Sequence, residues 1–349
     1  LGELLASPLD ITVSPWRVHL FPLITDAPRC SGPVLVAVFQ VSHAFADGRR
    51  ASALARGLFG AIPPVSPPPA RVPCSATRLA RAAGKLPGQI AGTVSLARRS
   101  IAAGRVLSAA ESEGAVPPKP NGFPLTRVNA DPGPYRSARM LVCDAARVKA
   151  PGVSVTIGAA TSISVALSRY LGDTQVLGAE VTVAVPDPTG HSRNSYRNVS
   201  VGLYPDVTDL RERAARIAAD LAQRQRRLTD PRVAAAAGSV EFVPARMLRA
   251  GVDGFDLSAI PETVAGNTDI SSVFRGAADL RLAGRPVRFT AGFPGLSPVM
   301  GLTHGIHGIG DTVTFGILAG PSVVPDIDRY AEILQAAIEE VADALNSPD

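Results

Sequence analysis

Apolar residues along the chain change from strand-like to helix-like spacing within its first sixty positions. Residues 33–43 are almost continuously apolar, which predicts a strand buried on both faces. From Arg49 to Phe59 the apolar residues instead recur every three or four positions, and this spacing predicts a helix. A strand, a turn and a helix therefore follow one another, with His43 where the strand ends and Gly48 in the turn.

The rest of the chain continues to mix the two kinds of spacing. A basic segment at 76–110 has helical spacing, and Gly84, Pro87 and Gly88 predict that it is divided into two helices. The other predicted strands are 137–142, 176–185, 271–274, 286–289, 302–309 and 312–318, and the other predicted helices are 154–171, 210–228 and 326–345. Mixed elements throughout predict the α/β class, as layered α+β structure.

Two stretches rich in proline and glycine separate these blocks. Prolines at 62–69 fix φ and remove amide donors, so this stretch is predicted to be an extended connector. The second stretch, 114–124, is a predicted linker between an N-terminal half, 1–113, and a C-terminal half, 125–349. A chain of 349 residues is long enough for two such halves.

Composition and charge narrow the classes of partner. No apolar run reaches the roughly 18 to 20 residues that cross a bilayer, so we expect a soluble or peripheral protein. The net charge of +5 favours anionic partners: nucleic acid, phospholipid headgroups or the phosphates of coenzyme A. Only 5% of residues are aromatic and none interleave with a basic stripe, so we expect no nucleic acid. The basic segment 76–110 either packs on its own domain, which we favour, or lies on a membrane surface.

Signatures of several chemistries are missing from the sequence. Cys30, Cys74 and Cys143 are spaced neither for disulfides nor for zinc, and this suits a reducing compartment. The histidines form no metal motif, and there is no nucleophile elbow, Walker loop or dinucleotide fingerprint, so neither a metal site nor a bound cofactor is expected. The candidate that remains is His43, because a histidine at a strand end can take a proton from an alcohol near neutral pH.

Residues 42–48, Ser-His-Ala-Phe-Ala-Asp-Gly, resemble the HHxxxDG signature of the chloramphenicol acetyltransferase-like superfamily. The surrounding order resembles the wax ester synthase/diacylglycerol acyltransferase family in particular. The matching segments are 7–16 ("PLD…PLW"), 124–136 ("T-x-L-N…R"), 155–171 (the "NDVVLA" helix), 197–200 ("GN-x-x") and 324–326 ("pD"). The resemblance covers nearly the whole chain.

Several positions depart from the family pattern. Ser42 stands where the first histidine of the motif is expected, Thr156 and Ile157 replace an Asn-Asp pair, and 271–276 differs from "SNVPGP". The family also has a strand and a helix before the "PLD" stretch, and their absence would leave a strand edge unpaired. The chain is therefore identified as a divergent member.

The resemblance implies a fold, a reaction and a base. The fold would be two chloramphenicol acetyltransferase-like subdomains with a central cleft or tunnel. The reaction would move a fatty acyl group from acyl-CoA, a co-substrate, to a long-chain alcohol or diacylglycerol, as in wax ester and triacylglycerol synthesis. His43, the second histidine position of the motif, would be the general base. The location would be cytoplasmic, with the inner membrane face or lipid droplets as a peripheral alternative.

The resemblance also suggests supporting residues. Asp47 and Gly48 would fix the turn, with Arg136 or Arg139 as the ion-pair partner of Asp47. Ser271 or Ser272 would donate a hydrogen bond to the developing oxyanion, and Asn198 would line the pocket or support it. Two alternatives stay open: a catalytically silent lipid- or acyl-binding homologue, and transfer from an acyl carrier protein instead of free acyl-CoA.

Overall fold

The structure, a computed structural model, describes residues 1–60, 75–185, 194–237, 243–254, 256 and 259–347. It has two compact units. The first comprises Leu1–Pro64, Pro120–Leu221 and Pro261–Asp349, and the second Val65–Lys119 and Ala222–Ile260. The predicted connector at 62–69 lies outside the described residues, and the division into halves at 114–124 stays a prediction.

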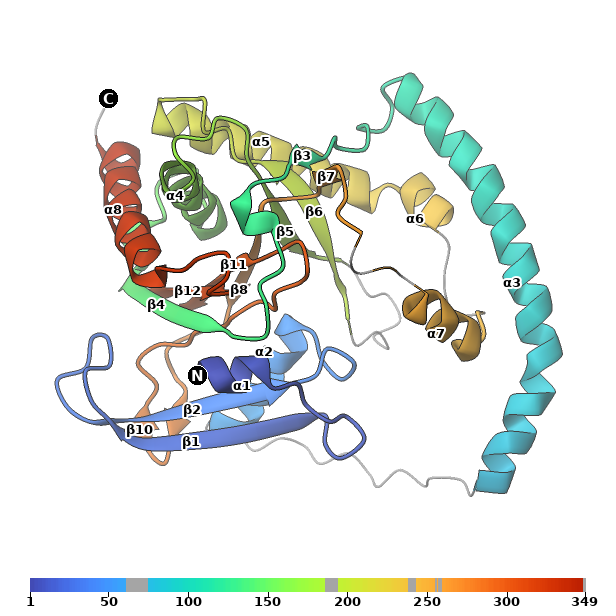
Figure 1. Cartoon of the computed structure of the whole chain (residues 1–349), viewed down its shortest axis with the longest axis horizontal. Helices are drawn as coiled ribbons and strands as arrows, with labels where there is room; N and C mark the ends of the chain where they lie inside the picture. The colour runs from blue at the N-terminus through green and yellow to red at the C-terminus, as the bar shows by residue number, and fades with distance from the viewer. Residues whose placement is uncertain (61–74, 186–193, 238–242, 255, 257–258, 348–349) are drawn as a thin grey trace. The chain divides into compact units, whose positions relative to one another are not determined.

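A mixed six-stranded sheet forms the centre of the first unit, in the order β4-β12-β11-β8-β5-β6 (Figure 1). Its strands are β4 (Ser137–Asp144), β5 (Gly178–Ala184), β6 (Tyr196–Gly202), β8 (Thr268–Phe274), β11 (Leu302–Ile309) and β12 (Thr312–Ala319). β8 runs parallel to both β11 and β5, whereas the other neighbours are antiparallel. The α/β class predicted from the sequence is confirmed, and so are these strands, except that β6 was not predicted.

Helices pack against one face of this sheet. They are α4 (Val155–Tyr170), the first part of α5 (Leu210–Thr229) and α8 (Ile327–Asn346). Ile270 of β8 and Phe315 of β12 are buried in the core that these helices share with the sheet. Because strand side chains alternate between faces, residues of the same parity as Ile270 point to the helices, and their neighbours point away.

The N-terminal block supplies a second, smaller layer of the same unit. It consists of α1 (Gly2–Ala6), the antiparallel pair β1 (Trp16–Ile24) and β2 (Val34–Val41), and α2 (Gly48–Phe59). The strand predicted at 33–43 is confirmed, but its burial on both faces is not, because Leu35 is 42% exposed. In the described part of the chain β2 pairs with β1 alone, so neighbouring strands shield it less than a central strand.

Two short ribbons complete the first unit. β3 (Phe123–Pro124) pairs with β7 (Thr263–Val264), and β9 (Arg281–Leu282) pairs with β10 (Arg285–Pro286). The strand expected at 286–289 was therefore wrong apart from its first residue. Pro286 lacks an amide donor, which limits how far this ribbon can extend.

The second unit is helical where it is described. It contains α3 (Ser75–Ser112), α6 (Pro231–Ala237) and α7 (Ala245–Asp253). α3 is one helix that continues through Pro87, so the division expected from the sequence was wrong. Within the described ranges, no helix combines the length and apolar character that crossing a membrane requires.

A buried polar chain joins the sheet to α8. His304 Nδ1 lies 2.9 Å from Thr268 Oγ1, and its Nε2 lies 2.8 Å from the Tyr330 hydroxyl. Thr268 Oγ1 also donates to the Leu302 carbonyl, so it accepts the proton of His304 Nδ1. In the neutral imidazole that burial favours, Nε2 accepts from the Tyr330 hydroxyl. Burial lowers the pKa of His304 to about 3.

We expect this histidine to make the fold sensitive to acid. Between its ordinary pKa of 6.5 and the folded value of about 3, the unfolded chain takes up a proton that the folded chain does not. The free energy of unfolding therefore falls with acid, by up to about 1.4 kcal/mol per pH unit for this one group. Denaturant titrations from neutral to acidic pH should show a shallower decline for His304→Gln than for the wild type, and equal slopes would contradict the assignment.

Candidate functional site

The turn between β2 and α2 carries the motif residues. Its first residue, Ser42, donates its amide to the Pro15 carbonyl at 2.8 Å, and its own carbonyl accepts from the amides of Phe45 and Ala46. The Ser42 hydroxyl also accepts from the amide of Ala44 at 3.2 Å. The serine that replaces the first histidine of the motif therefore organises the turn.

Asp47 connects the turn to the central sheet. Its side chain is 7% exposed. One carboxylate oxygen accepts from the amide of Arg50 at 2.8 Å and caps α2, and the other accepts from the amide of Ser195, next to β6, at 2.9 Å. The carboxylate thereby fixes both the helix start and its position beside β6.

The ion pair expected between Asp47 and Arg136 or Arg139 was wrong. Arg139 Nη2 instead pairs with Asp328 of α8 at 2.7 Å, and Arg136 donates to the Gly133 carbonyl at 2.6 Å. Both arginines lie in or next to β4, which forms the opposite edge of the sheet from β6. Backbone amides satisfy the buried carboxylate of Asp47 in place of a guanidinium.

His43 faces the beginning of β6. Its imidazole lies against the Tyr196 ring, with 5.6 Å between the ring centroids and 53° between the planes. Its carbonyl accepts from the Asn194 side-chain amide at 2.6 Å. His43 is exposed, so its imidazole is accessible from solvent.

The sheet face opposite the helices carries a set of polar side chains near this turn. Register pairs Glu180 with Asp269 and Thr182 with Asn198 across neighbouring strands, so each pair shares a face. Ser271 has the same parity as Asp269. We call this set, Glu180, Thr182, Asn198, Asp269 and Ser271, the polar face.

Ser271 and Ser272, which the sequence treats alike, lie on opposite sides of the sheet. The hydroxyl of Ser272 is 2.8 Å from that of Thr156 in α4, on the helix-covered side. Val273, of the same parity as Ser271, lies 3.4 Å from where a Cβ on Gly48 would stand. Of the two serines, Ser271 is therefore the one on the face toward the motif.

Two hydrogen bonds and one buried carboxylate define the polar face. The Asn198 amide donates to Glu180 at 3.2 Å, and its oxygen accepts from the Thr182 hydroxyl at 3.1 Å. Burial, and then the negative charge of Glu180, raise the pKa of Asp269 to about 7. One oxygen of Asp269 is buried without a hydrogen-bond partner among the described residues. Asp269 was not predicted from the sequence, although an acidic residue close to the strand predicted at 271–274 was a visible signal.

Arg275 fastens α2 to the central sheet. Its guanidinium donates to the Gly48 carbonyl at 3.2 Å and to the Ser52 hydroxyl, and it lies 3.1 Å from His307 Nδ1. Burial lowers the pKa of this guanidinium to about 10. Arg56, further along α2, pairs with Asp279. The motif helix is thus held from β6 by Asp47 and from the end of β8 by Arg275.

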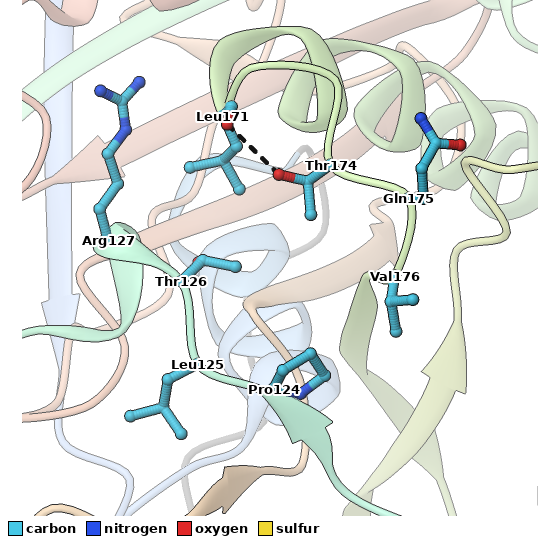
Figure 2. A pocket seen from close by; sticks show the side chains of 8 residues that line it. All are labelled: Pro124, Leu125, Thr126, Arg127, Leu171, Thr174, Gln175 and Val176. Atoms are coloured by element: carbon cyan, nitrogen blue, oxygen red, sulfur yellow. Dashed lines mark hydrogen bonds between the residues drawn. The ribbon is translucent and has the colours of Figure 1, made fainter.

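A separate hollow lies at the C-terminal end of α4 (Figure 2). The Thr174 hydroxyl there donates to the Leu171 carbonyl at 3.3 Å, and the Arg127 guanidinium lies 4.3 Å from the centre of the Tyr170 ring. The residues that line this hollow are Pro124, Leu125, Thr126, Arg127, Leu171, Thr174, Gln175 and Val176. None of them belongs to the motif or to the polar face.

Comparison with known proteins finds a family match for the C-terminal part of the chain. Residues 194–342 match the WS/DGAT C-terminal domain. This region contains Asn198, Asp269, Ser271 and Arg275. A search of curated protein sequences found no match.

The chain also resembles solved structures. The wax ester synthase/diacylglycerol acyltransferase from Marinobacter aquaeolei VT8 is 17% identical, with 97% of this chain and 73% of that chain covered and a TM-score of 0.56. The EpoB NRPS cyclization-docking bidomain from Sorangium cellulosum is 14% identical, with 95% and 63% covered and a TM-score of 0.48. The resemblance found in the sequence is thus confirmed: residues 194–342 match the C-terminal domain of the wax ester synthase/diacylglycerol acyltransferase family, and the chain has a fold similar to that of a wax ester synthase/diacylglycerol acyltransferase.

Proposed function

We propose that the protein is an O-acyltransferase that moves a fatty acyl group from acyl-CoA to a long-chain alcohol or diacylglycerol. The observation that carries this proposal is the position of the motif turn. Asp47 and Arg275 hold it beside the polar face, with His43 exposed next to Tyr196. The match of residues 194–342 to an acyltransferase domain supports the same reaction.

In the proposed reaction His43 acts as general base and then as general acid. Its neutral imidazole takes the hydroxyl proton while the alcohol oxygen attacks the thioester carbonyl carbon. The new C–O bond gives a tetrahedral oxyanion, which collapses as the C–S bond breaks. The departing thiolate takes the proton from the imidazolium, leaving the ester and coenzyme A. No acyl-enzyme is required.

The polar face supplies groups for the oxyanion and the acceptor. Ser271 lies on this face and can donate its hydroxyl proton to a developing negative charge. Glu180 and Asp269 place negative or partly protonated carboxyls on the same face, which disfavours an anionic acceptor and suits a neutral hydroxyl compound. We therefore propose that the acceptor is an alcohol and not a carboxylate. A cytoplasmic location agrees with an acyl-CoA donor and with the free thiols of Cys30 and Cys143.

Replacement of the proposed base tests the reaction directly. We expect His43→Gln to lower kcat for alcohol-dependent thiol release from long-chain acyl-CoA by about a hundredfold to ten-thousandfold, because a positioned base contributes that much. His19→Gln is the matched control, since His19 lies in β1 outside the motif and should leave kcat unchanged. Undiminished release by folded His43→Gln would overturn the proposal. A wild-type protein that binds acyl chains without releasing thiol would be the silent lipid-binding homologue.

The two adjacent serines give a second test with an internal control. We expect Ser271→Ala to lower kcat by about tenfold to a hundredfold with little change in KM, because the lost hydrogen bond forms with the oxyanion and not with the ground state. Ser272→Ala should keep kcat near the wild-type value, since that hydroxyl faces Thr156 of α4. Equal kcat values for the two variants would contradict the role of Ser271.

A further inference from the structure

A buried histidine of β11, His307, lies on the same face of the central sheet as the motif turn. Its side chain is 5% exposed. Register pairs His307 with Val273 of β8, whose side chain is the one next to Gly48. His304, three positions earlier, points to the other face and bonds Tyr330 of α8. The two buried histidines of β11 therefore serve opposite faces of the sheet, and the proposed reaction uses neither of them.

The contact that His307 makes is with the buried cation Arg275. No carboxylate pairs with this guanidinium in the part of the chain that the structure describes, and burial is what lowers its pKa to about 10. Its hydrogen bonds go to neutral groups: the Gly48 carbonyl, the Ser52 hydroxyl and His307 Nδ1. A buried charge without a counter-charge depends on such bonds for its stability.

Of these three acceptors, His307 alone belongs to the sheet. Gly48 and Ser52 lie in α2, the helix that Arg275 holds. The backbone of Arg275 is fixed to the sheet, since its amide donates to the Gly308 carbonyl at 2.7 Å. The direction of its long side chain is set from the sheet by the bond of 3.1 Å to His307 Nδ1. Without that bond the guanidinium would be held only by the helix that it positions.

The bond also defines the protonation state of His307. A guanidinium has donors and no acceptor, so His307 Nδ1 must accept, and the ring is neutral with its proton on Nε2. Burial, and then the positive charge of Arg275, lower the pKa of His307 to about 3. The imidazole therefore remains an acceptor for Arg275 at neutral pH.

The segment before β11 holds the imidazole in place. A Cβ on Gly292 would overlap the His307 ring, so this segment contacts the ring closely. Cβ atoms on Gly305 of β11 and Gly316 of β12 would likewise overlap the Gly292 carbonyl. Three glycines thus let the segment lie directly on the sheet, where it restricts the ring to one orientation.

We propose that His307 is a positioning residue for the motif turn: it orients Arg275, and through Arg275 it holds Gly48 and the start of α2 beside the central sheet. His307 acts on His43 only through this chain of contacts. Arg275 lies in 271–276, so the support comes from a segment that departs from the family pattern. The effect on catalysis rests on the proposed function, whereas the effect on α2 does not.

The effect on α2 can be measured without catalysis. In the wild type we expect NMR of ¹⁵N-labelled histidine to show His307 with Nε2 protonated and Nδ1 unprotonated. His307→Leu should raise the rate of hydrogen–deuterium exchange in the peptide 48–59 by about tenfold or more, because the start of the helix opens more often. His307→Asn, whose side-chain oxygen can replace Nδ1 as acceptor, should restore the wild-type rate. Gly292→Ala leaves His307 intact but displaces its ring, and should also speed exchange.

Acyl transfer provides the second measurement. We expect His307→Leu to lower kcat for alcohol-dependent thiol release by about tenfold to a hundredfold with little change in KM, because the base shifts relative to the bound substrate. Arg275→Met should cause the same loss, and adding His307→Leu to it should cause no further loss, since the histidine acts through the arginine. His304→Asn is the matched control on the opposite face and should leave both kcat and exchange in α2 unchanged.

Each of four results would overturn the proposal. They are the opposite tautomer of His307, unchanged exchange of α2 in folded His307→Leu, equally fast exchange in His307→Asn, and additive losses in the double variant. If His307→Leu does not fold, as judged by circular dichroism, unchanged exchange in Gly292→Ala contradicts the proposal in its place. A wild type that releases no thiol would instead contradict the proposed function, and the tautomer and the exchange rates would still decide the role of His307.

Discussion

The buried carboxylate of Asp47 is the interaction on which the candidate site depends. A charge with so little exposure is stable only if its oxygens are hydrogen-bonded, and each finds a backbone amide, one at the start of α2 and one beside β6. Those two amides come from segments almost 150 positions apart in the sequence. The same carboxylate thus shapes the turn and attaches it to the sheet, and His43 is exposed on that turn.

Local patterns were sufficient to predict much of the fold. The apolar run before His43 gave β2, helical spacing gave α2, and the strands and helices around the C-terminal half followed from alternation and from capping residues such as Asp326. β1 and β6 were not predicted from the sequence. β1 belongs to a two-stranded layer and β6 lies at the edge of the central sheet, and in both places the burial of side chains along the strand is uneven. A strand of that kind has no clear pattern until its partner is known.

The site divides in the same way between local and distant information. His43, Asp47 and Gly48 lie within one short motif, so the sequence presents them together. The sequence could not show that Arg275 and Asp269 lie near that motif, because β8 is distant from it along the chain and comes close to it only in the folded sheet. Because side chains alternate between the two faces along β8, Ser271 and Ser272 point to opposite sides of the sheet. The two serines can be told apart once the direction of one side chain in the strand is known. The partner of Asp47 was mistaken because a charged residue was expected where backbone amides suffice.

The passage of α3 through Pro87 has a mechanical consequence. A proline inside a helix has no amide proton for the carbonyl four residues earlier, so the Ala83 oxygen lacks its usual helical donor. The flanking Gly84 and Gly88 add little side-chain bulk to oppose bending at this point. The helix is consequently easiest to bend within its first third, between Leu79 and Ile90. A helix that bends at one point can follow a curved surface along more of its length than a straight, rigid helix can.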